Sequence, residues 1–82
     1  MEQIKNDLIG KTVMSEIGAS IGVIKKSMVD SDSGKISSVL IDPSQEINPE
    51  KFRLNEQGDI ILPYQDIFPV QDALVFEEKI DL

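Results

Sequence analysis

The densest group of potential ligand residues in this 82-residue chain is the run Asp30-Ser31-Asp32-Ser33-Gly34. Alternating carboxylates ahead of a glycine match the opening of a calcium-binding loop, in which side-chain oxygens hold the ion and the glycine permits a sharp turn. Such a loop needs a bidentate acid at its twelfth position, and counting from Asp30 that position is Ile41. The run therefore predicts a hairpin turn, with Asp30 and Gly34 as structural residues, and no metal site.

Histidine and cysteine are both absent from the chain. Their absence excludes Ser-His triads, histidine acid–base catalysis, thiolate metal sites and disulfides. Carboxylate pairs such as Asp30 with Asp42, or Glu77 with Glu78, could formally share acid–base work, but they lie in expected turns with no sign of a pocket. The glycine spacing matches neither a P-loop nor a dinucleotide fingerprint. We expect no catalytic residues and no cofactor.

The chain carries a net charge of −7, and residues 59–82 hold six of its fifteen acids against one base, Lys79. This sign repels phosphate backbones and anionic lipids, so we expect no nucleic-acid partner and no direct membrane insertion. A favourable electrostatic partner would meet the C-terminal third. No basic segment leads an apolar run, and no apolar stretch reaches a membrane span. With cysteine absent, these features predict a cytoplasmic protein.

Short apolar runs between turn residues predict one domain over residues 1–82. Residues 4–8 form a lead-in, a helical turn is expected at 66–70, and the strands are expected at 11–16, 21–30, 36–42, 52–54, 60–62 and 74–76. The apolar parity shifts within the second strand, so Gly22 is expected at a bulge or a close backbone approach. Gly58 is expected in a turn. The spacing is typical of a small antiparallel barrel or a strongly bent sheet, because closure removes the exposed edges that a short chain cannot cover.

Several short motifs follow one another along the chain: Gly10-Lys11, Ile21-Gly22 with Ile24, Val29-Asp30, Gly34-Lys35-Ile36, Val39-Leu40-Ile41-Asp42 and Leu62-Pro63. In this order and spacing they resemble the signature of the PRC-barrel family. The resemblance implies an all-β fold, a small six-stranded antiparallel PRC-type β-barrel with at most one or two short helical turns.

The resemblance also implies a protein-binding role. The family includes the cytoplasmic domain of the photosynthetic reaction-centre H subunit and the C-terminal domain of a ribosome-maturation factor. A free-standing domain of this length resembles the archaeal PRC-barrel proteins of cell division. By that resemblance we expect a non-enzymatic adaptor, which pairs with itself or with a homologous barrel and links a membrane-anchored division protein to the tether of the FtsZ ring.

Two other classes of function are weighed beside the adaptor. A ribosome-maturation or RNA-processing accessory module predicts a basic surface, which the net charge of −7 disfavours. A small enzyme or ligand binder needs a polar pocket, of which the sequence gives no sign.

Two segments, 60–62 and 74–76, are apolar on both parities, so one face of each is expected to lie outside the core. The expected partner-binding residues come from these segments and their neighbours: Ile60, Ile61, Leu62, Tyr64, Phe68, Leu74, Val75 and Phe76. The final strand is expected to be an edge to which another chain can add. Its acids Glu77, Glu78 and Asp81 would repel their copies in a two-fold dimer and favour a basic partner instead.

Overall fold

A computed structural model of the chain describes residues 8–71 and 73–77. In these ranges the strands are β1 (Thr12–Ser15), β2 (Ser20–Val29), β3 (Ile36–Pro43), β4 (Ile60–Pro63), β5 (Ile67–Val70) and β6 (Ala73–Phe76). Two single-turn 3₁₀ helices, η1 (Pro49–Lys51) and η2 (Tyr64–Asp66), lie between strands. The all-β class with few helical turns is confirmed. The expected lead-in before Leu8 and the acids Asp72, Glu78 and Asp81 lie outside the described residues.

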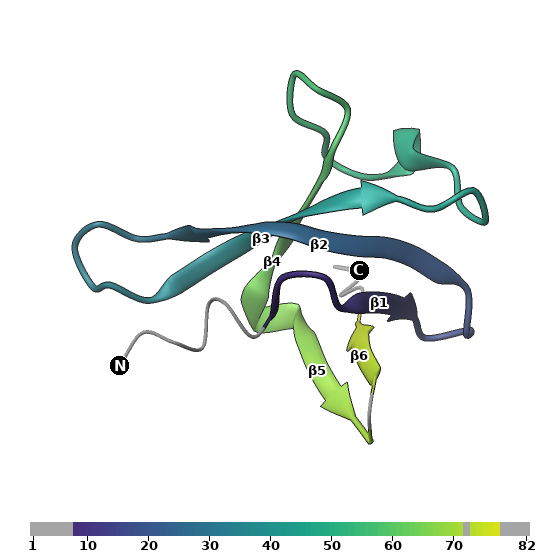
Figure 1. The fold of residues 1–82 in the computed structure, drawn as a ribbon, viewed down its shortest axis with the longest axis horizontal. Coiled ribbons are helices and arrows are strands. Elements are labelled where there is room, and N and C mark those ends of the chain that lie inside the picture. Colours follow the sequence, from purple (N-terminus) through teal and green to yellow (C-terminus); the bar gives the residue numbers. More distant parts are fainter. Residues whose placement is uncertain (1–7, 72, 78–82) are drawn as a thin grey trace, which may run out of the picture.

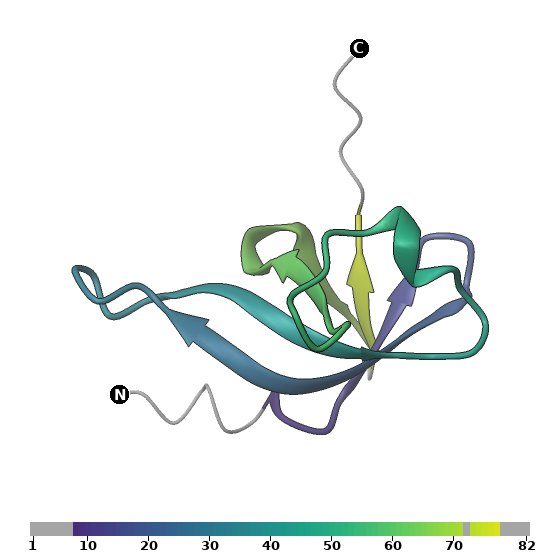
Figure 2. The same ribbon diagram turned by 90° about the horizontal axis from the view of Figure 1, so that it is seen from above.

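The strands form one sheet in the order β4-β3-β2-β1-β6-β5, which curls into a half-barrel (Figures 1 and 2). Every neighbouring pair is antiparallel except β1 and β6, which run parallel with Val13 opposite Leu74. The prediction of a purely antiparallel, closed barrel is therefore wrong. The chain leaves β4 through η2 and enters β5 at the other end of the sheet, so that β4 and β5 remain two separate edges.

The hairpin of β2 and β3 is antiparallel and turns at residues 30–34, as the sequence predicts. The Asp32 N–H donates to Asp30 Oδ1 (2.8 Å), and the Gly34 N–H donates to the Asp30 carbonyl (2.8 Å). Gly34 has a φ of +75°, a left-handed conformation that glycine adopts without strain. The Asp30 carboxylate therefore closes the turn, as the hairpin prediction requires. The end of this hairpin projects beyond the body of the sheet (Figures 1 and 2). We call it the arm: the last residues of β2 from Met28, the turn at 30–34 and the start of β3.

The parity shift in β2 comes from two bulges that flank Gly22. Ile21 is an extra residue opposite β1, and Lys25 is an extra residue opposite β3. Gly22 itself pairs with Pro43 of β3, and an added Cβ there would stand 2.1 Å from the Asp42 carbonyl oxygen. Only glycine leaves room for this close approach of two strands.

The core lies on the concave side of the half-barrel. Its buried residues are Leu8, Val13, Ile21, Ile24, Val39, Ile41, Ile60, Leu62 and Ile67. In β3 and β4 they alternate with outward-facing residues, which is how a sheet with one buried face divides its side chains, and the bulges of β2 interrupt this alternation.

Two elements differ from the sequence prediction. Residues 52–54 form a single bridge, Leu54 to Ile60, rather than a strand, because Phe52 turns inward and packs against the core. Residues 66–70 are mainly strand β5 rather than a helical turn, since pairing with β6 outweighs the local preference. The helical turn lies slightly earlier, at η2.

Candidate protein-interaction surface

The side chains of β4 alternate between the core and the outer side of the sheet, and only those on the outer side can contact a partner. Ile60 and Leu62 are buried, opposite Ile41 and Val39 of β3, so the structure places these two expected partner-binding residues in the core. Ile61 points to the outer side of the sheet and is half-buried. Tyr64 opens η2 and packs partly against the core.

The last strand is divided in the same way. Leu74 lies opposite Val13 and packs against the core, as does Phe76, whose ring tilts against Phe52 with centroids 6.4 Å apart. Val75 points outward. The prediction that β6 is an edge is wrong, because β6 lies between β1 and β5. Parallel pairing with β1 uses the backbone hydrogen-bonding groups of β6 that were expected to be free for another chain.

Val75 belongs to a row of apolar side chains on the outer side of the sheet. It is directly opposite Met14 of β1 and Phe68 of β5, so the three side chains lie side by side. We call Met14, Val75 and Phe68 the outer row. Phe68 is 39% exposed, and Val70, two residues further along β5, is 51% exposed. Met14 and Val75 are half-buried beside them, and a contiguous apolar patch on a sheet surface is typical of an association surface.

The free edge next to the outer row is β5, and its hydrogen-bonding groups are partly removed. The Glu77 N–H donates to the Asp66 carbonyl (2.9 Å), so the backbone of residue 66 faces β6. By the alternation of an antiparallel pair, Phe68 and Val70 also face β6, whereas Ile67 and Pro69 face away. Pro69 has no N–H to offer there. This edge is therefore poorly suited to accept another strand.

The other half of the sheet carries a shallow groove on its outer side, with a volume of about 450 Å³. Its floor is Leu40 paired with Ile61 across β3 and β4. The residues that line it are Met28, Ser37, Ser38, Leu40, Arg53, Ile61 and Pro63, and we call it the arm groove. A second hollow of about 190 Å³ lies beside Ile17, Phe52 and Phe76.

The chemistry of these two hollows is simple. Glu16 is the one acidic side chain lining either of them. Among the described residues no group of three or more acids is placed to hold a metal ion. Asp30 and Asp42, considered above as an acid–base pair, both lie exposed and outside the two linings.

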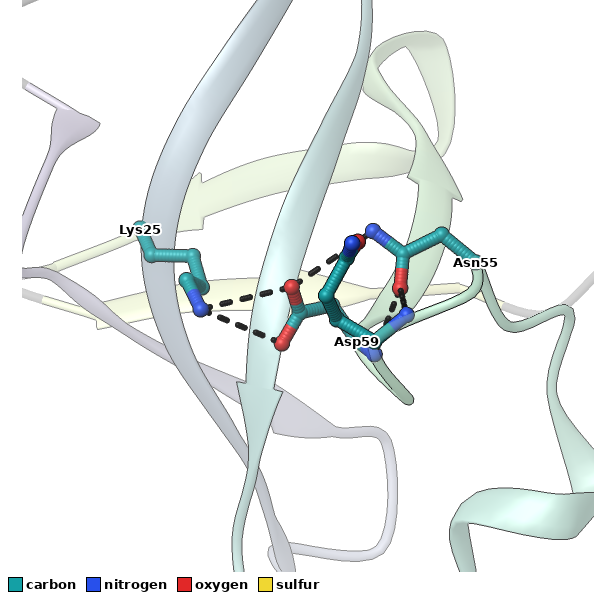
Figure 3. Close-up of polar contacts among 4 residues, drawn as sticks. Lys25, Asn55 and Asp59 are labelled. Carbon is teal, nitrogen blue, oxygen red and sulfur yellow. Dashed lines mark hydrogen bonds and ion pairs between the residues drawn. The ribbon is translucent and has the colours of Figure 1, made fainter.

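A polar cluster that the sequence analysis did not identify fixes the loop beside the groove (Figure 3). Lys25, at the second bulge of β2, places Nζ 3.3 Å from both Asp59 carboxylate oxygens. Asn55 Oδ1 accepts the N–H groups of Gln57 and Asp59, each at 2.9 Å, and Gly58 makes the turn with a φ of +85°. The Asn55-to-Asp59 turn could be recognised in the sequence, but the lysine that pairs with Asp59 lies 34 positions earlier in the chain.

The comparisons with known proteins agree with this geometry. The model for the PRC-barrel domain matches residues 2–81 of the chain. The search of curated proteins found no match to the chain. No helix in the described part of the chain is long and apolar enough to cross a membrane. Because the match spans almost every residue and the structure is a curled all-β sheet, the chain belongs to the family of PRC-barrel domains, which are generally protein-interaction modules.

Proposed function

We propose that this chain is a non-enzymatic adaptor that binds proteins through its outer row. The observation that carries the proposal is the alignment of Met14, Val75 and Phe68 at matching positions on three neighbouring strands. Burying apolar surface contributes on the order of 25 cal/mol per Å² before the cost of association is subtracted. A domain of this size buries only about six tenths of its unfolded surface, so an additional contact stabilises it noticeably.

A second copy of the chain or a homologous barrel is the partner we propose. An apolar sheet face packs well against another sheet face, because alternate side chains of the two faces interdigitate. Strand addition is disfavoured at β5 by Pro69, so face-to-face pairing is the better route to a dimer. The net charge of −7 makes two copies repel each other, and the dimer should therefore tighten as salt is added.

We place this pairing in the cytoplasm and in archaeal cell division. There the adaptor would link a membrane-anchored division protein to the tether of the FtsZ ring. This step is supported by the resemblance of the chain to free-standing archaeal PRC-barrel proteins. An affinity pull-down from native cells with mass spectrometry tests it: division proteins support the proposal, whereas ribosomal proteins would favour a ribosome-maturation role instead.

Light scattering over a concentration series tests the surface itself. Val75→Asp should keep the chain monomeric, because it places a charge at the centre of the outer row. Val29→Asp is the control, since it makes the same substitution at an exposed valine that lies on the arm and outside the outer row. Phe68→Ser is a second variant at an exposed site. A wild-type monomer at every concentration, with no PRC-barrel partner recovered, would overturn the pairing.

A further inference from the structure

The arm groove differs from the outer row in position and in chemistry. It lies over β2, β3 and β4, at the opposite end of the strand order from β5. Its floor and one wall are apolar, from Leu40, Ile61 and Met28. The outer row is purely apolar, whereas this groove adds a cation at its side.

The groove is lined by a positive charge, whereas the whole chain carries a net charge of −7. Arg53, the single arginine among fifteen acids and seven lysines, lines the groove, and no acidic side chain does. Lys26 is paired with Leu40 in register and so lies on the same side of the sheet. The ion pair between described residues is Lys25 with Asp59, which leaves Arg53 and Lys26 without a carboxylate partner in the described part of the chain.

Arg53 is also held in place by its backbone. Its carbonyl accepts the Ile61 N–H at 2.8 Å, and the next residue, Leu54, bridges Ile60. The Lys25, Asn55 and Asp59 cluster fixes the turn that follows. The loop therefore presents the guanidinium group from an ordered support. A guanidinium group matches the two oxygens of a carboxylate better than a lysine ammonium does.

We propose that the arm groove binds an extended, acidic peptide segment of a partner protein. An apolar side chain of that segment lies over Leu40 and Ile61, and a neighbouring carboxylate pairs with Arg53. Lys26 favours a second acidic residue in the segment. The site is separate from the outer row, so the adaptor has two surfaces for two kinds of partner. The basic partner expected for the acidic C-terminal third would bind elsewhere.

Nuclear magnetic resonance with the ¹⁵N-labelled full chain tests this proposal, using the synthetic peptide acetyl-EDLIED-amide as the probe. Backbone amide shifts should be largest at Met28, Leu40 and Ile61, and small at Val75. Two control peptides, acetyl-KKLIKK-amide and acetyl-EDSSED-amide, should bind more weakly, because each removes one half of the complementarity. Equal binding of either control peptide overturns the proposal.

Variants separate this site from the proposed pairing. Arg53→Glu should weaken peptide binding by about tenfold or more, since it replaces a charge-assisted hydrogen bond with repulsion. Lys35→Glu makes the same charge change outside the groove lining and should leave binding within about twofold. Val75→Asp should abolish pairing yet keep peptide binding. Equal effects of the first two variants, or tighter binding of an RNA oligomer than of the peptide, overturn the proposal.

Discussion

Replacing Gly22 with alanine would place a methyl carbon 2.1 Å from the Asp42 carbonyl oxygen and 2.6 Å from Ile41 Cγ2. Real Cβ contacts essentially never fall below 3.0 Å, so β2 and β3 would have to separate by roughly 1 Å at this point. The nearest atom belongs to the backbone, and Gly22 pairs with Pro43 inside the ladder. A change of side-chain rotamer cannot relieve such a clash.

The expected cost follows from these contacts. Overpacking that side chains can absorb costs about 1–3 kcal/mol, and each ladder hydrogen bond that is lost adds about 1 kcal/mol. We therefore expect Gly22→Ala to lower the free energy of unfolding by about 4 kcal/mol. At about 0.05–0.15 kcal/mol per residue, a domain of this size has roughly 4–12 kcal/mol in total. The variant should melt at least about 15 °C lower, or lose its cooperative transition.

Gly34→Ala is the matched control. Gly34 has a φ of +75°, and an added Cβ there meets nothing within 4 Å. Its cost is the left-handed conformation alone, about 1–2 kcal/mol, or a fall in Tm of roughly 4–15 °C. Circular dichroism melts and urea titrations of both variants give the comparison. If Gly22→Ala melts within a few degrees of Gly34→Ala, the reasoning that β3 crosses tightly over Gly22 is refuted.

Three further predictions concern the polar cluster, the edge and the turn. Asp59→Ala should lower the free energy of unfolding by about 1–2 kcal/mol in urea titrations, and Lys25→Met by less, because the Lys25 side chain is 51% exposed; equal losses would contradict this. Pro69→Thr restores an outward N–H on β5 and should raise aggregation in sedimentation assays with little change in Tm; unchanged solubility would count against it. Calorimetric titration with calcium should show no binding, and micromolar binding at Asp30 would contradict the interpretation of residues 30–34 as a turn without a metal site.

The parts of the fold that could be predicted are those encoded by neighbours in sequence. The hairpin of β2 and β3 follows from the turn chemistry of Asp30 and Gly34, which acts over a few residues. The parallel pairing of β1 with β6 has no such local signal, because the two strands come from opposite ends of the chain. The short strand β5 was hidden for a related reason, since its sequence suits a turn until β6 pairs with it.

The candidate site could be predicted only in part. A segment that is apolar on both parities, such as 74–76, shows that one side lies outside the core without showing which. The register with β1 decides it, and turns Val75 outward while Leu74 faces inward. Arg53 lies in the segment 52–54, which was expected to be a strand. Its place beside the arm groove depends on a loop that a local turn, Asn55 to Asp59, and one distant side chain, Lys25, hold together.

The parallel contact between β1 and β6 also bears on how the chain folds. The meander from β2 to β4 pairs strands that are near neighbours in sequence, so it can form early. The other side of β1 pairs with β6, which can happen only after the chain between the two strands has folded back on itself. The entropy cost of closing so long a loop slows that step. Folding times of milliseconds to seconds are typical of such topologies. During synthesis, β1 would therefore lack one of its two neighbours until β6, residues Ala73–Phe76, has been made.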